Sequence, residues 1–200
     1  SGYVKTKIAV PEGKEINRIV EEIAVVQSKL CIGLKCGIEP TSKEYYALML
    51  GGCIFGGSPF SKLFTNVREK LSLAYYASVR TERFKSTMFI SSGIETDKYQ
   101  AAYDEILVQF NKMKSGDITD SEVVNSKLYL TNGFNSMKDG LRTMEDYYLS
   151  QAIMDNKGEI DDLIEMTNKV TKEEIVEAFN KVEIDTVYFL KGCASDGGDE

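Results

Sequence analysis

Two runs rich in β-forming residues, 73–81 and 86–93, are separated by only four residues of the chain. Such a pair, joined by a short connection, is typical of an antiparallel β-hairpin. A sheet built on this hairpin must bury one of its faces against another layer, and helices are the elements available elsewhere in the sequence. The hairpin therefore constrains the fold more than any other feature of the chain.

Helical patterns stand on both sides of the hairpin. Three segments, 41–44, 119–122 and 171–174, have a Thr followed three residues later by Glu, the pattern of a capping box at a helix N-terminus. Each precedes an apolar run with helical periodicity. The sequence predicts helices after residue 44 and over about 58–70, 97–114, 119–138, 141–152, 159–168 and 171–180.

Further strands are expected before and after these helices. Leu30, Ile32 and Leu34 alternate with other residues, Val187 and Phe189 do so near the end, and residues 3–10 are another candidate. This order predicts an α+β fold, an antiparallel sheet with helices packed on one face. The length suits a single domain, which we place at residues 1–192, with a frayed tail at 193–200.

Histidine is absent from all 200 residues. Its absence excludes a Ser-His-Asp triad, a Cys-His dyad and a His-x-x-Glu-His zinc helix. Any general acid or base would have to be Asp, Glu, Lys, Tyr or Cys. The composition thus disfavours a complete hydrolase of the common kinds, and we expect this chain to bind no metal.

The net charge and the cysteine content indicate the kind of partner and the cellular compartment to expect. A net charge of −7 argues against nucleic acid or an anionic membrane as the main partner. No run approaches the roughly 20 apolar residues of a membrane span, and no signal peptide is visible. The cysteines form no Cys-x-x-Cys pair, and we expect idle thiols in a reducing cytoplasm. They are Cys31, Cys36, Cys53 and Cys193.

A glycine-containing segment resembles a phosphate-binding loop in one respect only. Gly52 and Gly57 have the required separation, but Ser58 and Pro59 stand where such a loop needs Lys and Ser or Thr. We therefore reject a nucleotide site. The glycines are interpreted as ending one helix and letting the next begin close by.

Two other patterns favour structural explanations. Adjacent carboxylates diverge by about 100° on a helix, so they make poor acid/base pairs and are interpreted as solvated. These pairs are Glu21-Glu22, Asp161-Asp162 and Glu173-Glu174. In each tyrosine doublet, one ring is expected to face the core and the other the surface. The doublets are Tyr45-Tyr46, Tyr75-Tyr76 and Tyr147-Tyr148.

The stretch from 55 to 75 combines a glycine turn, an amphipathic helix and the start of a strand. Leu63, Phe64 and Val67 are expected to point inward from that helix. Arg68 falls in its last turn, and Tyr75 lies early in the strand that doubles back along it, so both can project from one rim. Taken alone, this geometry favours structural roles, with Arg68 complementing the helix C-terminus and Tyr75 packing.

The same stretch closely resembles the C-terminal half of the pitrilysin/insulinase family of zinc metallopeptidases, which includes the mitochondrial processing peptidases. The matching residues are Gly56-Gly57, Ser61 to Phe64, Arg68 to Lys70 and Leu73 to Tyr75. The order of elements over residues 28–192 fits more loosely. The likeness is greatest to bacterial cytoplasmic members with two halves in one chain.

The resemblance implies a division of labour between two homologous halves that close around a peptide. The N-terminal half of the family holds zinc through His-x-x-Glu-His and a further Glu. The C-terminal half lacks these ligands and supplies an arginine and a tyrosine that bind the substrate and the transition state. On this chain they correspond to Arg68 and Tyr75, seven residues apart. The resemblance thus implies no cofactor here, zinc on the homologous partner half, and a peptide substrate.

Three functions remain open at this stage. The first is a non-catalytic half of a zinc metallopeptidase that forms half of the peptide chamber. The second is a structural or interaction module that pairs with a homologous half without turnover. The third is an autonomous enzyme that uses carboxylates or tyrosine, which ranks low because no spacing singles out an acid/base pair.

Overall fold

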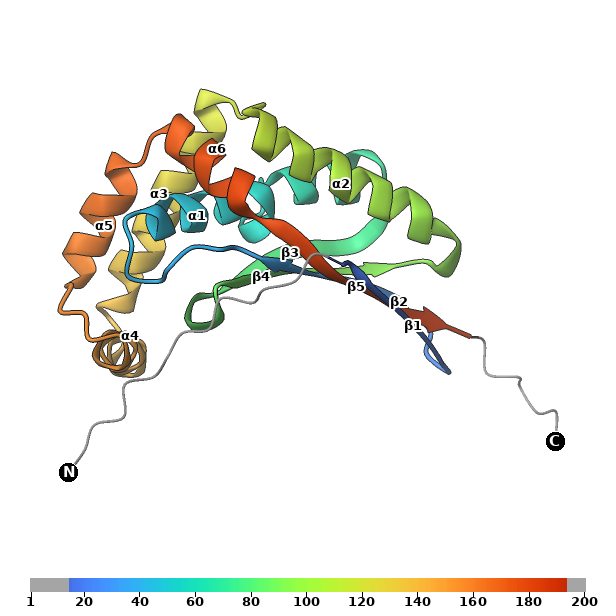
Figure 1. The fold of residues 1–200 in the computed structure, drawn as a ribbon, viewed down its shortest axis with the longest axis horizontal. Coiled ribbons are helices and arrows are strands. Elements are labelled where there is room, and N and C mark those ends of the chain that lie inside the picture. The colour runs from blue at the N-terminus through green and yellow to red at the C-terminus, as the bar shows by residue number, and fades with distance from the viewer. Residues whose placement is uncertain (1–14, 194–200) are drawn as a thin grey trace.

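The computed structural model describes residues 15–193. Its strands form one five-stranded sheet in the order β1-β5-β2-β4-β3, and its helices cover one face of that sheet (Figure 1). The strands are β1 (Asn17–Ile23), β2 (Ser28–Lys35), β3 (Ala74–Glu82), β4 (Thr87–Ile94) and β5 (Glu183–Gly192). The predicted α+β fold with helices on one face is therefore confirmed. The candidate strand at 3–10 and the tail at 194–200 lie outside the described residues.

Strand pairing departs from the expected antiparallel pattern at one edge. The hairpin β3–β4 is antiparallel as predicted, and β2 runs antiparallel to both β4 and β5. Strand β1 instead pairs parallel with β5, so the sheet is mixed. Strand β1 was not predicted, because all seven of its residues are exposed and it lacks the apolar alternation of a half-buried strand.

Glu21 and Glu22 lie on β1, so treating this pair as part of a helix was wrong. Neighbouring side chains of a strand point to opposite faces of the sheet. The Tyr188 hydroxyl donates to Glu21 at 2.7 Å, and Lys191 pairs with Glu22 at 2.5 Å. The two carboxylates therefore tie β1 to β5 and form no acid/base pair.

The helices follow the predicted order with shifted ends. They are α1 (Glu44–Gly52), the π-helical turns η1 (Cys53–Gly57) and η2 (Leu63–Lys70), α2 (Tyr99–Ser115), α3 (Asp120–Met137), α4 (Leu141–Ile153), α5 (Ile160–Lys169) and α6 (Lys172–Lys181). Short 3₁₀ turns, η3 (Arg83–Lys85) and η4 (Thr96–Lys98), follow β3 and β4. The helix expected from residue 58 starts later, because Ser58 is extended and residues 59–61 form a turn.

The capping boxes at Thr119 and Thr171 are confirmed, with each hydroxyl accepting a bond from the N–H three residues later. The box at 41–44 was a wrong prediction. Lys43 already has helical backbone angles as the N-cap of α1 and makes no side-chain cap. A capping box of a different composition begins α5. The side chain of Glu159 accepts from the backbone N–H of Asp162, and the side chain of Asp162 accepts from the backbone N–H of Glu159. The acidic pairs at 161–162 and 173–174 therefore lie in the first turns of helices, where negative charge is favoured.

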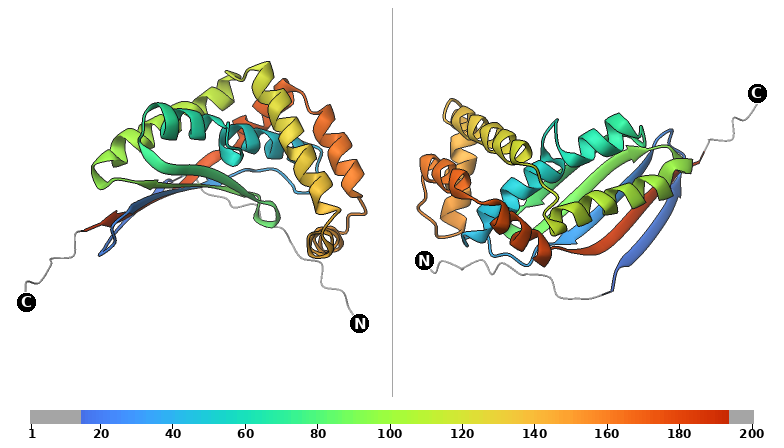
Figure 2. Two further views of the ribbon diagram at one scale, coloured as in Figure 1. Left: turned by 180° about the vertical axis from the view of Figure 1, so that it is seen from behind. Right: turned by 90° about the horizontal axis from the view of Figure 1, so that it is seen from above.

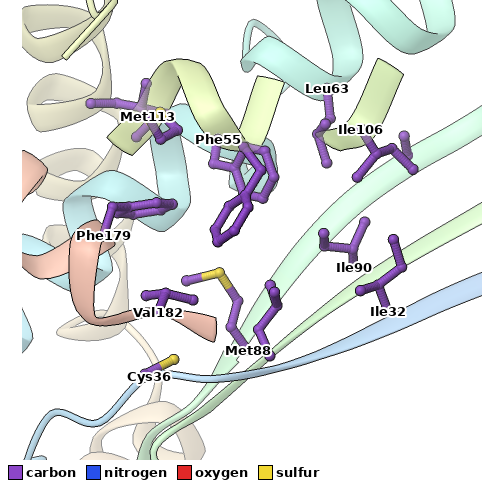
Figure 3. Close-up of a cluster of buried hydrophobic side chains, with 14 of the residues drawn as sticks. Ile32, Cys36, Phe55, Leu63, Met88, Ile90, Ile106, Met113, Phe179 and Val182 are labelled. Carbon is purple, nitrogen blue, oxygen red and sulfur yellow. The ribbon is translucent and has the colours of Figure 1, made fainter. Parts of the chain in front are cut away.

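The main core lies between the helices and the covered face of the sheet. Side chains of Ile32, Met88 and Ile90 point from the strands toward the helical layer, with Met88 on the side of Phe55 and the two isoleucines on the side of Ile106 (Figure 3). Leu30, Ile32 and Leu34 are completely or almost completely buried, as their alternation predicted. Burial of each such side chain contributes about 1.5–3 kcal/mol, so this layer holds the helices in place over the sheet.

No described helix covers the opposite face of the sheet (Figure 2). Exposed aromatic rings lie there against glycines. A Cβ on Gly93 would fall 2.5 Å from the ring of Tyr76, and one on Gly33 would fall 3.9 Å from that of Phe89. Cys31 and Ser91 lie side by side on the same face. This part of the open face therefore combines aromatic rings with small residues.

Candidate functional site

The glycine segment brings a helix close to the edge strand β3. The helical run α1–η1 ends at Gly57, as the sequence analysis expected, because Ser58 takes up an extended conformation. A Cβ on Gly56 would lie 2.4 Å from Val79 of β3, so this position requires glycine. The close approach of η1 to β3 was not foreseen.

The segment between η1 and η2 is fixed by a buried ion pair. Lys62 is only 7% exposed, and its Nζ lies 2.9 Å from Oε1 of Glu122 on α3. Burial alone would raise the pKa of Glu122, but hydrogen bonds from the Thr119 N–H and from Lys62 outweigh it and lower that pKa. The ion pair therefore anchors the start of η2 on α3.

A second anchor ties η2 to helix α2. Asn66 donates through its side chain to the Lys62 carbonyl at 2.9 Å and to the buried Gln109 at 3.2 Å. Leu63 and Val67 are fully buried beneath the turn, as predicted. The other expected core residue, Phe64, is only half-buried. These contacts hold the last turn of η2, which carries Arg68, against the body of the protein.

Arg68 projects from η2 into solvent. Its guanidinium lies 4.7 Å from the centre of the Phe64 ring, and its Nε lies 3.6 Å from a carboxylate oxygen of Glu69. Ring and guanidinium can attract each other at this distance. Side-chain exposures of 43% for Arg68 and 55% for Glu69 make the ion pair a weak one. The charged fork is thus accessible to a ligand.

A tight reversal connects η2 to β3. Ser72 has a left-handed backbone (φ +50°), and its N–H donates to the carbonyl of Arg68. The N–H of Leu73 then donates to the carbonyl of Val67 at 2.9 Å. Non-glycine residues seldom adopt this conformation. The reversal makes β3 double back beside the helical turn, so Tyr75 comes close to Arg68.

A β-bulge turns Tyr75 outward. Ala74 pairs with Ile94 and Tyr76 pairs with Gly93, which leaves Tyr75 without a partner on β4. Both tyrosines are exposed, 58% for Tyr75 and 36% for Tyr76, so the expectation of one inward ring is wrong for this doublet. A β-bulge commonly changes the direction of a side chain in this way. The residues around Tyr75 include no glycine or proline that would have predicted this bulge.

Arg68 and Tyr75 line the same pocket, of about 410 Å³, at the start of the edge strand β3. Its other lining residues are Glu69, Ser72, Leu73, Ala74, Glu95 and Lys98. The Tyr75 hydroxyl donates to Glu95 at 3.5 Å, and Lys98 pairs with Glu95 at 3.1 Å. The structure thus brings the two predicted residues together and adds Glu95 and Lys98, which no pattern in the sequence had indicated.

The chemistry available in this pocket is hydrogen-bond donation. A guanidinium and a phenol are donors suited to a peptide carbonyl or to the oxyanion it becomes. Within residues 15–193, no three Cys, Asp, Glu or His side chains come together in a way that could hold a metal ion. Burial raises the pKa of the Cys36 thiol to about 12, which suits a core residue and not a nucleophile.

Comparison with known proteins decides the family. The model of the peptidase M16 inactive domain matches residues 4–130, more than half of the chain. The chain belongs to this family. The predicted membership in the non-catalytic part of a zinc metallopeptidase family is thereby confirmed.

Relatives of this M16 inactive domain bear names of the same kind. It is 38% identical over 174 residues to the probable inactive metalloprotease YmfF of Bacillus subtilis, covering 87% of the chain and 41% of that protein. It is 28% identical to the uncharacterized zinc protease YmxG of the same organism, covering 80% of the chain and 37% of that protein.

A solved structure has the same fold as the M16 inactive domain described here. A conserved protein from Enterococcus faecalis V583 superposes with a TM-score of 0.87 at 30% identity, over 93% of this chain and 44% of that one. This domain thus spans less than half the length of each of these three proteins. Among the described helices, none combines the length and apolar character needed to cross a membrane.

Proposed function

We propose that this chain is the peptide-binding, non-catalytic half of a zinc metallopeptidase. In this proposal the open face of the sheet lines one wall of the peptide chamber, and Arg68 and Tyr75 act at its rim. The observation that carries the proposal is the placement of both side chains in one pocket beside the edge strand β3. Two separate local features, the reversal at Ser72 and the bulge at Tyr75, are needed to produce it.

Each donor has a distinct part in the proposed chemistry. The planar fork of the Arg68 guanidinium can donate two parallel bonds to a carbonyl oxygen or a carboxylate. The Tyr75 hydroxyl donates one bond and can keep it to a carbonyl oxygen while the carbonyl carbon becomes tetrahedral and the oxygen gains negative charge. Such donors stabilise charge that develops in the transition state, and the loss of one typically costs about 10²–10³ in rate.

Zinc and the general base come from the homologous half in this proposal. The chain has no histidine, and its described side chains do not fit a metal, so no step is assigned to zinc here. The matched region is less than half of YmfF and of the Enterococcus faecalis protein, so each of them is long enough to contain a second half of similar size. That half is either part of the same full-length chain or a separate subunit.

The proposed setting is a reducing cytoplasm, without nucleic acid or membrane as a partner. The four cysteines are free, which supports such a compartment. The acidic net charge would repel anionic surfaces.

Recombination with the zinc-bearing half tests the proposal. We expect the assembled protein to cleave peptides, and Arg68→Ala and Tyr75→Phe each to slow cleavage by about 10²–10³. Arg142→Ala and Tyr148→Phe are matched controls, because these exposed residues of α4 line no part of the pocket. Rates that stay at the wild-type level in the pocket variants would show that the assigned roles are wrong.

The second candidate function is a module that pairs with a homologous half without turnover. The name of YmfF, a probable inactive metalloprotease, favours it. This candidate predicts a stable complex of the two halves that hydrolyses no peptide and contains no zinc. Zinc content and peptide cleavage of the full protein distinguish the two functions. Peptidase activity of the purified chain in the presence of a chelator would instead revive the autonomous enzyme.

A further inference from the structure

Among the described residues, the side chain of Tyr75 makes one polar contact, from its hydroxyl to Glu95. The bulge gives its residue no partner on β4, and its side chain is largely exposed. Within the described part of the chain, the carboxylate of Glu95 is the hydrogen-bond partner of its hydroxyl. The orientation of the phenol therefore depends on Glu95.

Glu95 is well placed to serve as a fixed acceptor. It directly follows Ile94, the last residue of β4, whose side chain is fully buried and which pairs with both Ala74 and Ser28. The 3₁₀ turn η4 begins at the next residue. The backbone of Glu95 is thus held between a core strand and a helical turn.

Lys98 also binds the carboxylate of Glu95. Its Nζ lies 3.1 Å from Oε1 of Glu95, the same oxygen that accepts from Tyr75. The same Nζ donates to the carbonyl of Ser72 at 3.3 Å, and the N–H of Ser72 donates to the carbonyl of Arg68. A continuous set of bonds therefore connects the Tyr75 hydroxyl to the backbone of Arg68.

We propose that Glu95 is a positioning residue, which holds the Tyr75 hydroxyl beside Arg68 until a peptide carbonyl takes its place as acceptor. Lys98 keeps Glu95 in position before and after that exchange. This inference rests on the proposed function, because it assumes that Tyr75 donates to a peptide.

The geometry suits such an exchange. Strong bonds from a hydroxyl to a carboxylate measure about 2.5–2.7 Å, whereas this one is 3.5 Å long and therefore weak. When the Tyr75 hydroxyl turns to a peptide carbonyl, the ion pair between Glu95 and Lys98 remains, so the carboxylate is still paired. The contact restricts the phenol in the free protein and costs little to break.

Fluorine NMR tests the contact without any activity. The 200-residue chain is labelled with 3-fluorotyrosine, and Tyr75→Phe identifies the signal of Tyr75. We expect Glu95→Ala to shift that signal and Glu95→Gln to shift it less, because the amide oxygen still accepts. Glu69→Ala is the matched control, since Glu69 lines the same pocket but pairs with Arg68. An unchanged Tyr75 signal in Glu95→Ala would overturn the proposal.

Kinetics of the recombined protein test the consequence. We expect Glu95→Ala to raise KM about two- to fivefold, the lower part of the range for one hydrogen bond, because the contact exists only in the free protein, with kcat changed by less than about twofold. Glu95→Gln should restore most of the wild-type KM, and Lys98→Met should give an intermediate value. In the Tyr75→Phe background, Glu95→Ala should have no further effect.

The outcomes separate this inference from the proposed function. If Tyr75→Phe leaves cleavage unchanged, the role of Tyr75 and its positioning by Glu95 both fail. If Tyr75→Phe slows cleavage but Glu95→Ala leaves KM unchanged, only the positioning fails. If the effects of the two substitutions multiply, Glu95 acts independently of Tyr75, and the positioning again fails.

Discussion

The backbone N–H of Ser72 donates to the carbonyl oxygen of Arg68 at 3.1 Å, and this bond closes the turn that brings Tyr75 back toward Arg68. Ser72 adopts a left-handed conformation there, with φ +50°. Through its backbone carbonyl, Arg68 thus helps to form the turn that positions Tyr75. The stability of this turn can be tested directly.

Substitutions at Ser72 should follow the rules for left-handed residues. We expect Ser72→Val to destabilise the fold by about 1–2 kcal/mol, because a β-branched residue is strained in this conformation. Ser72→Gly should change stability by less than about 1 kcal/mol, since relief of strain is offset by greater freedom of the unfolded chain. Urea unfolding measures both. Ser78→Val, the same change at an exposed strand position, is the control and should not destabilise.

A larger residue at Gly93 should destabilise the fold. A Cβ there would lie 2.5 Å from the ring of Tyr76 and 2.9 Å from the side chain of Gln27. We expect Gly93→Ala to displace the ring and cost about 1–3 kcal/mol in unfolding free energy. Gly33→Ala is the control, because its Cβ would meet Phe89 at an ordinary 3.9 Å. Equal stability of the two variants would contradict this account.

Stability should depend on pH through Glu122. The pKa of this group is lowered in the folded protein, so its contribution is present above the unfolded pKa, near 4.5, and is lost as the pH falls through the folded value. We expect Glu122→Ala to cost about 2–4 kcal/mol at pH 7, because it leaves Lys62 buried without a partner.

The difference between wild type and Glu122→Ala should shrink as the pH falls below about 4.5, as measured by urea unfolding across the pH range. Lys62→Met should cost less at pH 7, since it removes the buried charge itself. A pH-independent difference would show that the ion pair does not contribute through ionisation of Glu122.

The four thiols should separate into two classes. Cys36 and Cys53 are buried, and burial raises the pKa of both thiols, whereas Cys31 and Cys193 are partly exposed. We expect iodoacetamide at pH 8 to modify the latter two within minutes and to spare the former until the chain is unfolded. Mass spectrometry counts the modified residues. Rapid modification of Cys36 in the native chain would contradict its burial.

Elements with local signals were predictable from the sequence. The hairpin 73–93 and the capping boxes at Thr119 and Thr171 follow from short-range patterns, and the structure has them within one or two residues. The edge strand β1 was missed, because it is exposed throughout and its partner β5 lies more than 160 residues further along the chain. No pattern in a short window carries such a pairing.

The candidate site was predictable only in part. The family resemblance singled out Arg68 and Tyr75, and the structure places them in one pocket. Glu95 and Lys98 reach this pocket because β4 returns beside β3 and ends there. A carboxylate and a lysine three residues apart are common in any chain, so nothing in the sequence distinguishes them.

The position of β5 in the middle of the sheet has a consequence for biosynthesis. Strand β5 lies between β1 and β2, so the first described strand cannot join the sheet until the last one has left the ribosome. Translation at about 5–20 residues per second makes that interval roughly 10–30 seconds. During this time the backbone edge of β2 that β5 later covers is unpaired, and such an edge can pair with another chain.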